Sequence, residues 1–222
     1  MHRDLKTENV LIFKNGQAKI ADLGLAKQMH YRQNVASNTI VTLAYRAPEI
    51  ILGEQNYLYS VDIWSMGCIM IELLSNNLKI PFLYSDDEEQ SSVMNAQDQQ
   101  YMPCAKTLAL IFSYLGLPTE LPTNPYARCM NNNEFKKTWP LLQQQVIERR
   151  DLREGFGIKD LEALDLIKKC LRLDPDERIT CHEALQHSYF KDVLGGQMVV
   201  GGELYGLLNG RPNRAQQPNG AT

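Results

Sequence analysis

The 222-residue chain lacks an excess of charge of either sign, and it lacks a long hydrophobic run. Lys and Arg number 23 and Asp and Glu number 26, so the net charge is −3. This balance argues against bulk nucleic-acid binding, because proteins of that class present a basic face. The longest apolar stretch, residues 63–74, is too short to cross a bilayer and contains Ser65 and Glu72. The sequence therefore predicts neither a direct nucleic-acid partner nor a membrane partner.

The chain also lacks paired cysteines and an apolar leader. Its five cysteines are odd in number, scattered and never in a C-x-x-C pair: Cys68, Cys104, Cys129, Cys170 and Cys181. Their spacing argues against a disulfide framework and against a zinc site, and it favours a reducing compartment. Because the first residues, Met-His-Arg-Asp, are polar, we expect no signal peptide and a nuclear or cytoplasmic location.

A hydrophobic content of 44% is enough to build a core, and the apolar residues indicate where its elements lie. Residues 10–13 and 17–20 are apolar runs around Lys-Asn-Gly, which predicts a hairpin because Asn-Gly tolerates positive φ. Residues 21–46 show little periodicity and are predicted to form a long functional loop. Residues 60–74 are apolar on nearly all sides, which predicts a buried helix.

The second half of the chain alternates between expected helices and irregular segments. The acidic stretch 84–101 is predicted to be a surface loop or a partly disordered insert, and 117–140, rich in Pro and Asn, to be irregular. Helical spacing covers 105–115 and 160–172, the latter with Leu161, Leu164, Ile167 and Leu171 on one face. A capping box, Thr180 to Glu183, opens a short helix through His187. Residues 191–222 are expected to be a flexible tail.

Three motifs in the first fifty residues carry the chemistry. The sequence His-Arg-Asp-Leu-Lys-Thr-Glu-Asn spans 2–9, Asp22-Leu23-Gly24 follows, and Ala47-Pro48-Glu49 comes last. In order and spacing they resemble the catalytic loop, the metal-binding motif and the end of the activation segment of eukaryotic protein kinases. The resemblance implies ATP and Mg²⁺ as cofactors and transfer of the γ-phosphate to a protein substrate.

Residue roles follow from this resemblance and from the needs of phosphoryl transfer. Asp4 would accept or orient the proton of the substrate hydroxyl, and Lys6 would contact the γ-phosphate. Asn9 and Asp22 would supply oxygen ligands to magnesium. Lys6 and Thr42 resemble the residues of serine/threonine kinases, in which the threonine bridges the catalytic Asp and Lys.

Three further positions match residues with structural roles in protein kinases. Asp62 matches the aspartate that holds the backbone of the catalytic loop. Arg178 matches the arginine that pairs with the Glu of Ala-Pro-Glu, here Glu49, and a buried charge needs such a partner. A small-molecule phosphotransferase could share a related loop, but the match of Glu49, Asp62 and Arg178 to protein kinases argues against that class.

The segments 41–53, 59–69 and 111–120 resemble the cyclin-dependent kinases, in the group that includes the MAP kinases. A cyclin partner is implied by this resemblance alone, and residues 117–158 occupy the place of the group-specific insert. The acidic stretch, the Asp-Leu-Gly and the Gln/Asn-rich tail resemble the Mediator-associated members more weakly. Ala44 stands where that pattern has Trp, which weakens the packing below the substrate groove and bears on the preference for proline. Thr7 replaces the usual Pro, and Leu23 the commoner Phe.

The resemblance covers only the C-terminal lobe of a kinase, residues 1–190. No G-x-G-x-x-G occurs, and the lysine and glutamate of the small lobe are not matched. We therefore expect a mainly α, protein-kinase-like fold with a small β-hairpin at the catalytic edge and without the N-terminal β lobe. One hypothesis is a truncated serine/threonine kinase that is inactive alone. The alternative is a non-catalytic, kinase-derived interaction module.

The loop between Asp22 and Glu49 has an unusual charge. Its 26 residues contain no Asp or Glu but do contain Lys27, Arg32 and Arg46. Ser37 lies ten residues before Ala47, where cyclin-dependent kinases carry their activating threonine. Phosphate on Ser37 would bring about −1.5 to −2 charges. We expect Ser37 to be an activating phosphorylation site, with Arg3 and Lys27 as its partners.

Overall fold

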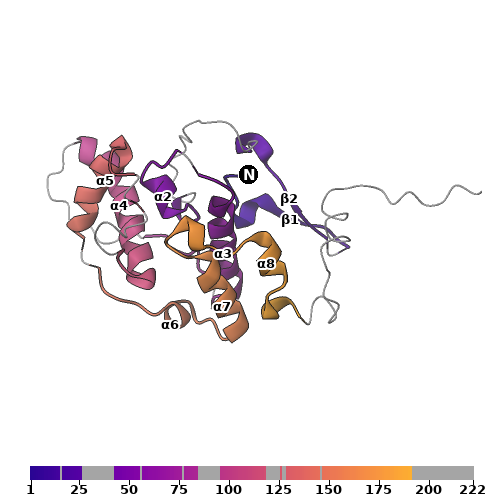
Figure 1. Cartoon of the computed structure of the whole chain (residues 1–222). Helices are drawn as coiled ribbons and strands as arrows, with labels where there is room; N and C mark the ends of the chain where they lie inside the picture. The colour runs from indigo at the N-terminus through magenta and orange to yellow at the C-terminus, as the bar shows by residue number, and fades with distance from the viewer. Residues whose placement is uncertain are drawn as a thin grey trace, which may run out of the picture.

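The computed structural model describes residues 1–15, 17–26, 43–55, 57–76, 78–84, 96–118, 126, 129–145 and 147–191. Its helices surround α3, and a two-stranded hairpin extends from one side (Figure 1). The α-helices are α2 (Pro48–Ile51), α3 (Ser60–Leu74), α4 (Ala96–Leu115), α5 (Asn133–Gln143), α6 (Leu152–Phe156), α7 (Leu161–Cys170) and α8 (Cys181–Leu185). The 3-10 turns are η1 (Thr7–Asn9), η2 (Leu23–Leu25), η4 (Pro175–Glu177) and η5 (Ser188–Phe190). The predicted mainly helical architecture is confirmed.

Helix α3 forms the centre of the core, with the bounds that its apolar sequence predicted. Trp64 and Ile71 are fully buried, and Ser65 donates to the carbonyl of Tyr45, 3.0 Å away. A Cβ at Gly67 would lie 2.9 Å from the Cβ of Cys170, so the glycine permits the close approach of α7. Helix α3 is therefore fixed in the core and can support the loops that bind to it.

Helix α7 packs against α3 through the stripe Ala163, Leu164, Leu166, Ile167 and Cys170. The expectation that Leu161 belongs to this buried face is wrong, because its side chain is 61% exposed. Leu161 is the first helical residue, next to the cap Asp160, and lies outside the stripe that follows. The predicted capping box of α8 is present: the side chains of Thr180 and Glu183 each bind the other residue's backbone amide.

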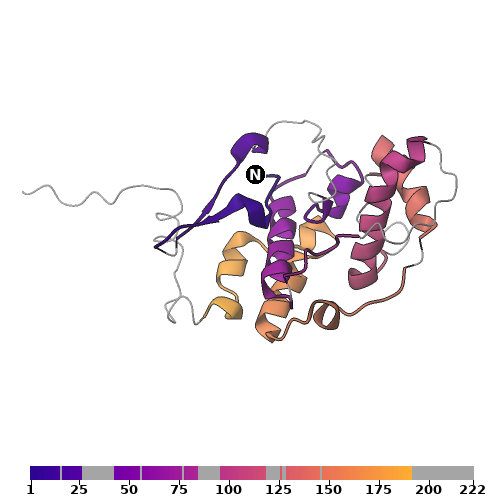
Figure 2. The same cartoon turned by 180° about the vertical axis from the view of Figure 1, so that it is seen from behind.

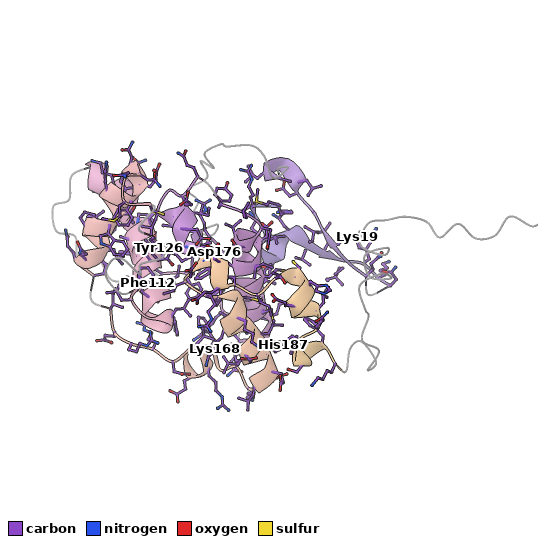
Figure 3. All side chains as sticks on the ribbon, in the orientation of Figure 1. Lys19, Phe112, Tyr126, Lys168, Asp176 and His187 are labelled. Carbon is purple, nitrogen blue, oxygen red and sulfur yellow. The ribbon has the colours of Figure 1, made fainter. Side chains whose placement is uncertain are left out.

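Helices α4 and α5 pack against each other on the side of α3 opposite the hairpin (Figures 1 and 2). Phe135 and Trp139 stack with ring centroids 4.9 Å apart. Phe112 and Tyr126, labelled in Figure 3, lie 6.2 Å apart. Phe112 of α4 and Trp139 of α5 meet edge to face with ring centroids 6.5 Å apart, so aromatic side chains join the two helices in the second half of the core.

Two irregular segments expected from composition are partly helical. Helix α5 covers 133–143, so the expectation of irregular structure over 117–140 is wrong at its end, because Phe135, Thr138, Leu141 and Leu142 form a buried face. Helix α4 begins at Ala96, so the acidic loop expected over 84–101 is wrong for 96–101. Ala and Gln are good helix formers, and Tyr101 packs on the core. Residues 85–95 and the expected tail beyond 191 lie outside the described residues.

Strands β1 (Val10–Ile12) and β2 (Ala18–Ile20) form the predicted hairpin, in antiparallel register Val10 to Ile20. Asn15 Oδ1 accepts from the amide of Gln17 in the turn. The hairpin points away from the helices (Figure 2). The side chain of Ile12 is 71% exposed. Its base returns the chain from Asn9 to Ala21, whose amide donates to the Asn9 carbonyl at 2.8 Å.

Candidate active site

The loop 2–9 is fixed to the first turn of α3 by one carboxylate. Asp62 Oδ2 accepts from the amide of His2 at 2.8 Å, and Oδ1 accepts from the amide of Arg3 at 2.7 Å. Arg3 has φ of +72°, a conformation that costs a non-glycine residue about 1 kcal/mol or more. The two charge-assisted hydrogen bonds offset this strain and hold Asp4 at a defined place.

His2 joins this loop to the segment that carries Asp22. Its Nε2 lies 2.9 Å from the carbonyl of Ala21, and the amide of Asp4 donates to Nδ1 at 3.4 Å. Both contacts fit a neutral ring with its proton on Nε2. No role for His2 was predicted from the sequence. Its position in the His-Arg-Asp triplet was the available signal.

Asp4, Lys6 and Asn9 form one cluster. Lys6 Nζ lies 2.9 Å from Asp4 Oδ2. Asn9 Nδ2 donates to the Asp4 carbonyl at 2.8 Å and lies 3.5 Å from Asp4 Oδ2. Asp4 Oδ1 and Asn9 Oδ1 accept no hydrogen bond from the described residues. One oxygen of each residue is thus left for groups from outside the chain.

Asp22 lies across the hairpin base from Asn9. Its backbone is left-handed, with φ of +61°, and its Oδ1 accepts from the amide of Gly24 at 3.2 Å. A Cβ at Gly24 would lie 3.1 Å from that oxygen, so the glycine gives the carboxylate room. The side chain is exposed. Asp22 therefore presents a carboxylate to solvent at the edge where Asn9 also lies.

The donor set fits a hard divalent cation. An amide oxygen and a carboxylate are ligands that Mg²⁺ accepts, and Mg²⁺ completes its shell with water and phosphate oxygens. Within the described residues, no group of three or more His, Cys, Asp or Glu side chains could hold a metal on its own. Asn9 and Asp22 would be the residues that hold magnesium beside a bound phosphate.

Arg3 is already bound to its surroundings. Its Nε donates to the carbonyl of Leu25 at 2.6 Å, and its Nη1 donates to the Tyr57 hydroxyl at 3.2 Å. The first bond joins this loop to the residue just after Asp22-Leu23-Gly24, and the second joins it to the segment before α3. The other residues of the regulatory expectation, Lys27 and Ser37, lie outside the described residues, and so does Thr42.

A small hollow of about 30 Å³ lies beside Asp4, bordered also by Arg3, Arg46 and Tyr57. A hollow of this size has room for at least one water molecule. Burial lowers the pKa of Arg46. Ala44, which stands in place of Trp, is 1% exposed and does not border the hollow.

A buried ion pair holds α2 to the chain near the C-terminal end of α7. Arg178 Nη1 and Nη2 donate to Glu49 Oε1 and Oε2 at 2.6 and 2.7 Å, and both side chains are fully buried. Arg178 Nη1 also donates to the Ser60 carbonyl at 3.0 Å, and its guanidinium lies over the Trp64 ring. The pair joins residues 129 positions apart, so it connects two segments that are distant in the sequence.

Comparison with known proteins identifies the fold. The family model "Protein kinase domain" matches residues 1–190. The chain belongs to the protein kinase family. Its sequence is similar to that of a cyclin-dependent kinase, and its fold is similar to those of a CTD kinase and a MAP kinase.

The kinase is 36% identical over 191 residues to Cyclin-dependent kinase C-2 of Oryza sativa subsp. japonica. The match covers 86% of this chain and 32% of that protein, so the chain spans about a third of this relative's length.

Two solved structures share the fold. One is the yeast RNA Pol II CTD kinase CTDK-1 complex, with a TM-score of 0.61 and 29% identity, covering 86% of this kinase and 55% of that chain. The other is the MAP kinase LMAMPK10 of Leishmania major. It has a TM-score of 0.63 and 24% identity over 86% of this chain and 50% of that one, and shows the fold alone. In the described part of the kinase, no helix is both long and apolar enough to cross a membrane.

Proposed function

We propose that this chain carries the catalytic edge of a serine/threonine protein kinase that transfers the γ-phosphate of ATP to a protein hydroxyl. The observation that supports the proposal is the Asp4–Lys6–Asn9 cluster, which Asp62 fixes beside Asp22. A loop with no chemical task needs no such convergence of polar groups. The preference for Ser and Thr is supported by Lys6, two residues after Asp4.

The geometry supports separate tasks for the two oxygens of Asp4. Lys6 binds Oδ2, so Oδ1 is the oxygen that accepts the hydrogen bond of the substrate hydroxyl and directs it toward the phosphate. Lys6 has three N–H donors, and those that Asp4 does not use can neutralise charge on the transferred phosphoryl group. Bound Mg²⁺ supplies charge neutralisation on the phosphates. Asn9 Oδ1 and Asp22 would hold it.

The experiment measures phosphate transfer from MgATP to a set of Ser-, Thr- and Tyr-containing peptides. The chain is assayed both as these 222 residues and joined to a kinase small lobe. We expect the 222 residues alone to be inactive, because their sequence contains no glycine-rich phosphate loop. In the joined form, Asp4→Asn and Asp22→Asn should each abolish transfer to Ser and Thr peptides, with circular dichroism unchanged. Undiminished transfer by either variant would overturn the assignment.

The alternative is a non-catalytic interaction module. It is favoured by the exposed apolar side chains of the hairpin and η2, of which Ile12 is 71%, Leu23 68% and Ile20 58% exposed. Such a face is suited to contact with another protein surface. In that case Asp4→Asn would leave every biological effect of the chain intact, whereas Ile12→Asp would remove it.

Partners and location are proposed from a named relative and from the cysteine content. We propose a protein substrate and a cyclin as partners, since the rice relative is named a cyclin-dependent kinase. We also propose a nuclear or cytoplasmic location, supported by the odd number and scattered spacing of the five cysteines. Ser37 remains proposed as the activating site. Ser37→Ala in the active, partner-bound enzyme should lower turnover severalfold, and mass spectrometry should find phosphate on Ser37.

A further inference from the structure

Thr7 occupies the position at which related kinases have proline, and its side chain makes contacts that proline could not make. Its Oγ1 lies 3.0 Å from Glu72 Oε2 and 3.2 Å from Glu72 Oε1, on helix α3. The Tyr45 hydroxyl lies 3.2 Å from Thr7 Oγ1 and donates to Glu72 Oε2 at 2.5 Å. Three segments that are far apart in the sequence thus meet at one carboxylate.

Proton counting settles the direction of these bonds. Thr7 has one hydroxyl proton, and its nearest acceptor is Glu72; the carboxylate of Glu8 lies farther away, at 3.3 Å, on the exposed side. The Tyr45 hydroxyl donates a hydrogen bond to Glu72. Burial, together with this carboxylate, raises the pKa of Tyr45. Glu72 therefore receives two hydroxyl donors. It forms no ion pair within the described residues.

The backbone at this position would accept the family's proline. Lys6 is extended, with φ of −157° and ψ of 165°, which is the conformation that a residue before proline prefers. Thr7 is the first residue of η1, a place that proline tolerates. The hydroxyl is therefore a different way of holding the same turn, through a bond to α3 instead of a fixed ring.

The turn matters because it carries the polar cluster. Turn η1 begins directly after Lys6 and ends at Asn9, whose amide donates to the Lys6 carbonyl at 3.0 Å. The amide of Val10 donates to the Thr7 carbonyl and closes the turn. A shift of Thr7 would move Lys6 and Asn9 relative to Asp4, which Asp62 holds separately.

We propose that Thr7 is a positioning residue of this kinase, whose hydroxyl binds Glu72 and thereby holds the turn that carries Lys6 and Asn9. Its effect on turnover rests on the proposed function, whereas its effect on the turn does not. Helix α3 then supports the catalytic loop at two points, Asp62 at one end of the loop and Glu72 near the other.

The experiment compares Thr7→Val, which removes the hydroxyl, with Thr7→Ser, which keeps it. Amide hydrogen exchange in the 222-residue chain is read at Asn9 and Val10, with the amides of α7 as the internal reference. Thr7→Val should speed exchange at Asn9 and Val10 by about tenfold, the scale of a lost hydrogen bond to a charged group, without changing α7. Thr7→Ser should restore protection, and Glu72→Gln should speed exchange as Thr7→Val does.

Thr138→Val is the matched control. The Thr138 hydroxyl lies buried in α5 and has no hydrogen-bond partner among the described residues, so its removal should leave Asn9 and Val10 unchanged. Unchanged exchange at Asn9 and Val10 in Thr7→Val, or a Thr7→Ser variant as fast as Thr7→Val, would overturn the proposal.

Turnover separates this inference from the proposed function. In a form that shows Asp4-dependent transfer, Thr7→Val should lower kcat about tenfold and leave KM for ATP within about twofold, with rescue by Thr7→Ser. Absent transfer in every form would count against the proposed function, while the exchange difference would still support the role of Thr7. Normal transfer together with unchanged exchange in Thr7→Val would count against Thr7 alone.

Discussion

At the edge that carries the candidate active site, loop 2–9 is held by hydrogen bonds to carboxylates on α3. The body of the protein, formed by helices α2 to α8, is held by packed apolar side chains. The loop has Asp62 and Glu72 as its supports, and nearby strand residues such as Ile12 are exposed. In the body, residues such as Trp64 and Phe112 are buried, and α7 approaches α3 at Gly67. Substitutions at the edge should therefore loosen a site locally, and substitutions in the body should lower the stability of the whole fold.

The largest effect is expected where a polar contact lies inside the body. Arg178→Leu leaves Glu49 buried without its cation, and breaking such a pair costs about 3 to 5 kcal/mol of unfolding free energy. Urea denaturation measures this loss. Lys169→Ala is the control, because the Lys169–Asp165 pair is half exposed and worth at most about 1 kcal/mol. Equal losses in the two variants would contradict the distinction between buried and exposed pairs.

Asp62→Ala tests the support of the edge. It removes the acceptor of the His2 and Arg3 amides, and hydrogen bonds to charged groups contribute about 1.5 to 3 kcal/mol. Hydrogen exchange of amides 2–4 should become fast while the amides of α7 keep their protection. Asp62→Asn keeps one acceptor oxygen and should give a smaller change. Loss of protection throughout the chain would show that Asp62 belongs to the global core.

Gly67→Ala tests the packing of the body. The added Cβ would lie 2.9 Å from side-chain atoms of Cys170 and Leu171, and such overpacking costs about 1 to 3 kcal/mol. The thermal midpoint should fall, with hydrogen exchange in loop 2–9 changed no more than elsewhere. Met66→Ala, at the 41% exposed neighbour, is the control and should have little effect. An unchanged midpoint in Gly67→Ala would show that α7 can move away at no cost.

The same contrast explains which features the sequence could predict. Helix α3, the hairpin and the α8 cap were predicted because each depends on neighbours within one element. Helix α5 was missed because its Pro and Asn content indicated irregular structure, while the packing of α4 against it decides its conformation.

Long-range polar contacts were the least predictable part of the site. Asp4, Asn9 and Asp22 were predicted as site residues from sequence motifs, and the order of the motifs along the chain indicated one site. Thr7 and Glu72 lie 65 residues apart, and the hydroxyl-to-carboxylate bond between them leaves no periodic pattern in the sequence. Thr7 was noticed only as a departure from the family motif. Its partner Glu72 could be identified only from the structure, because packing decides which residue of α3 faces the loop.

The smallest effect is expected from pH at a cap remote from both regions. Glu183 accepts hydrogen bonds from the Thr180 amide and hydroxyl, both at 2.8 Å, and the bond from the Thr180 amide is the main cause that lowers the pKa of the Glu183 carboxyl below its usual 4.5. A lowered pKa means that the folded state favours the ionised form. The stabilisation is therefore complete above about pH 4.5 and is lost as the pH falls through the lowered pKa. Chemical denaturation should find wild type more stable than Glu183→Gln at pH 7, with the difference shrinking below about pH 4.5. Asp165, whose pKa is also lowered, is present in both proteins and cancels in the comparison. A difference independent of pH would mean that the shape of the side chain, and not its charge, caps α8.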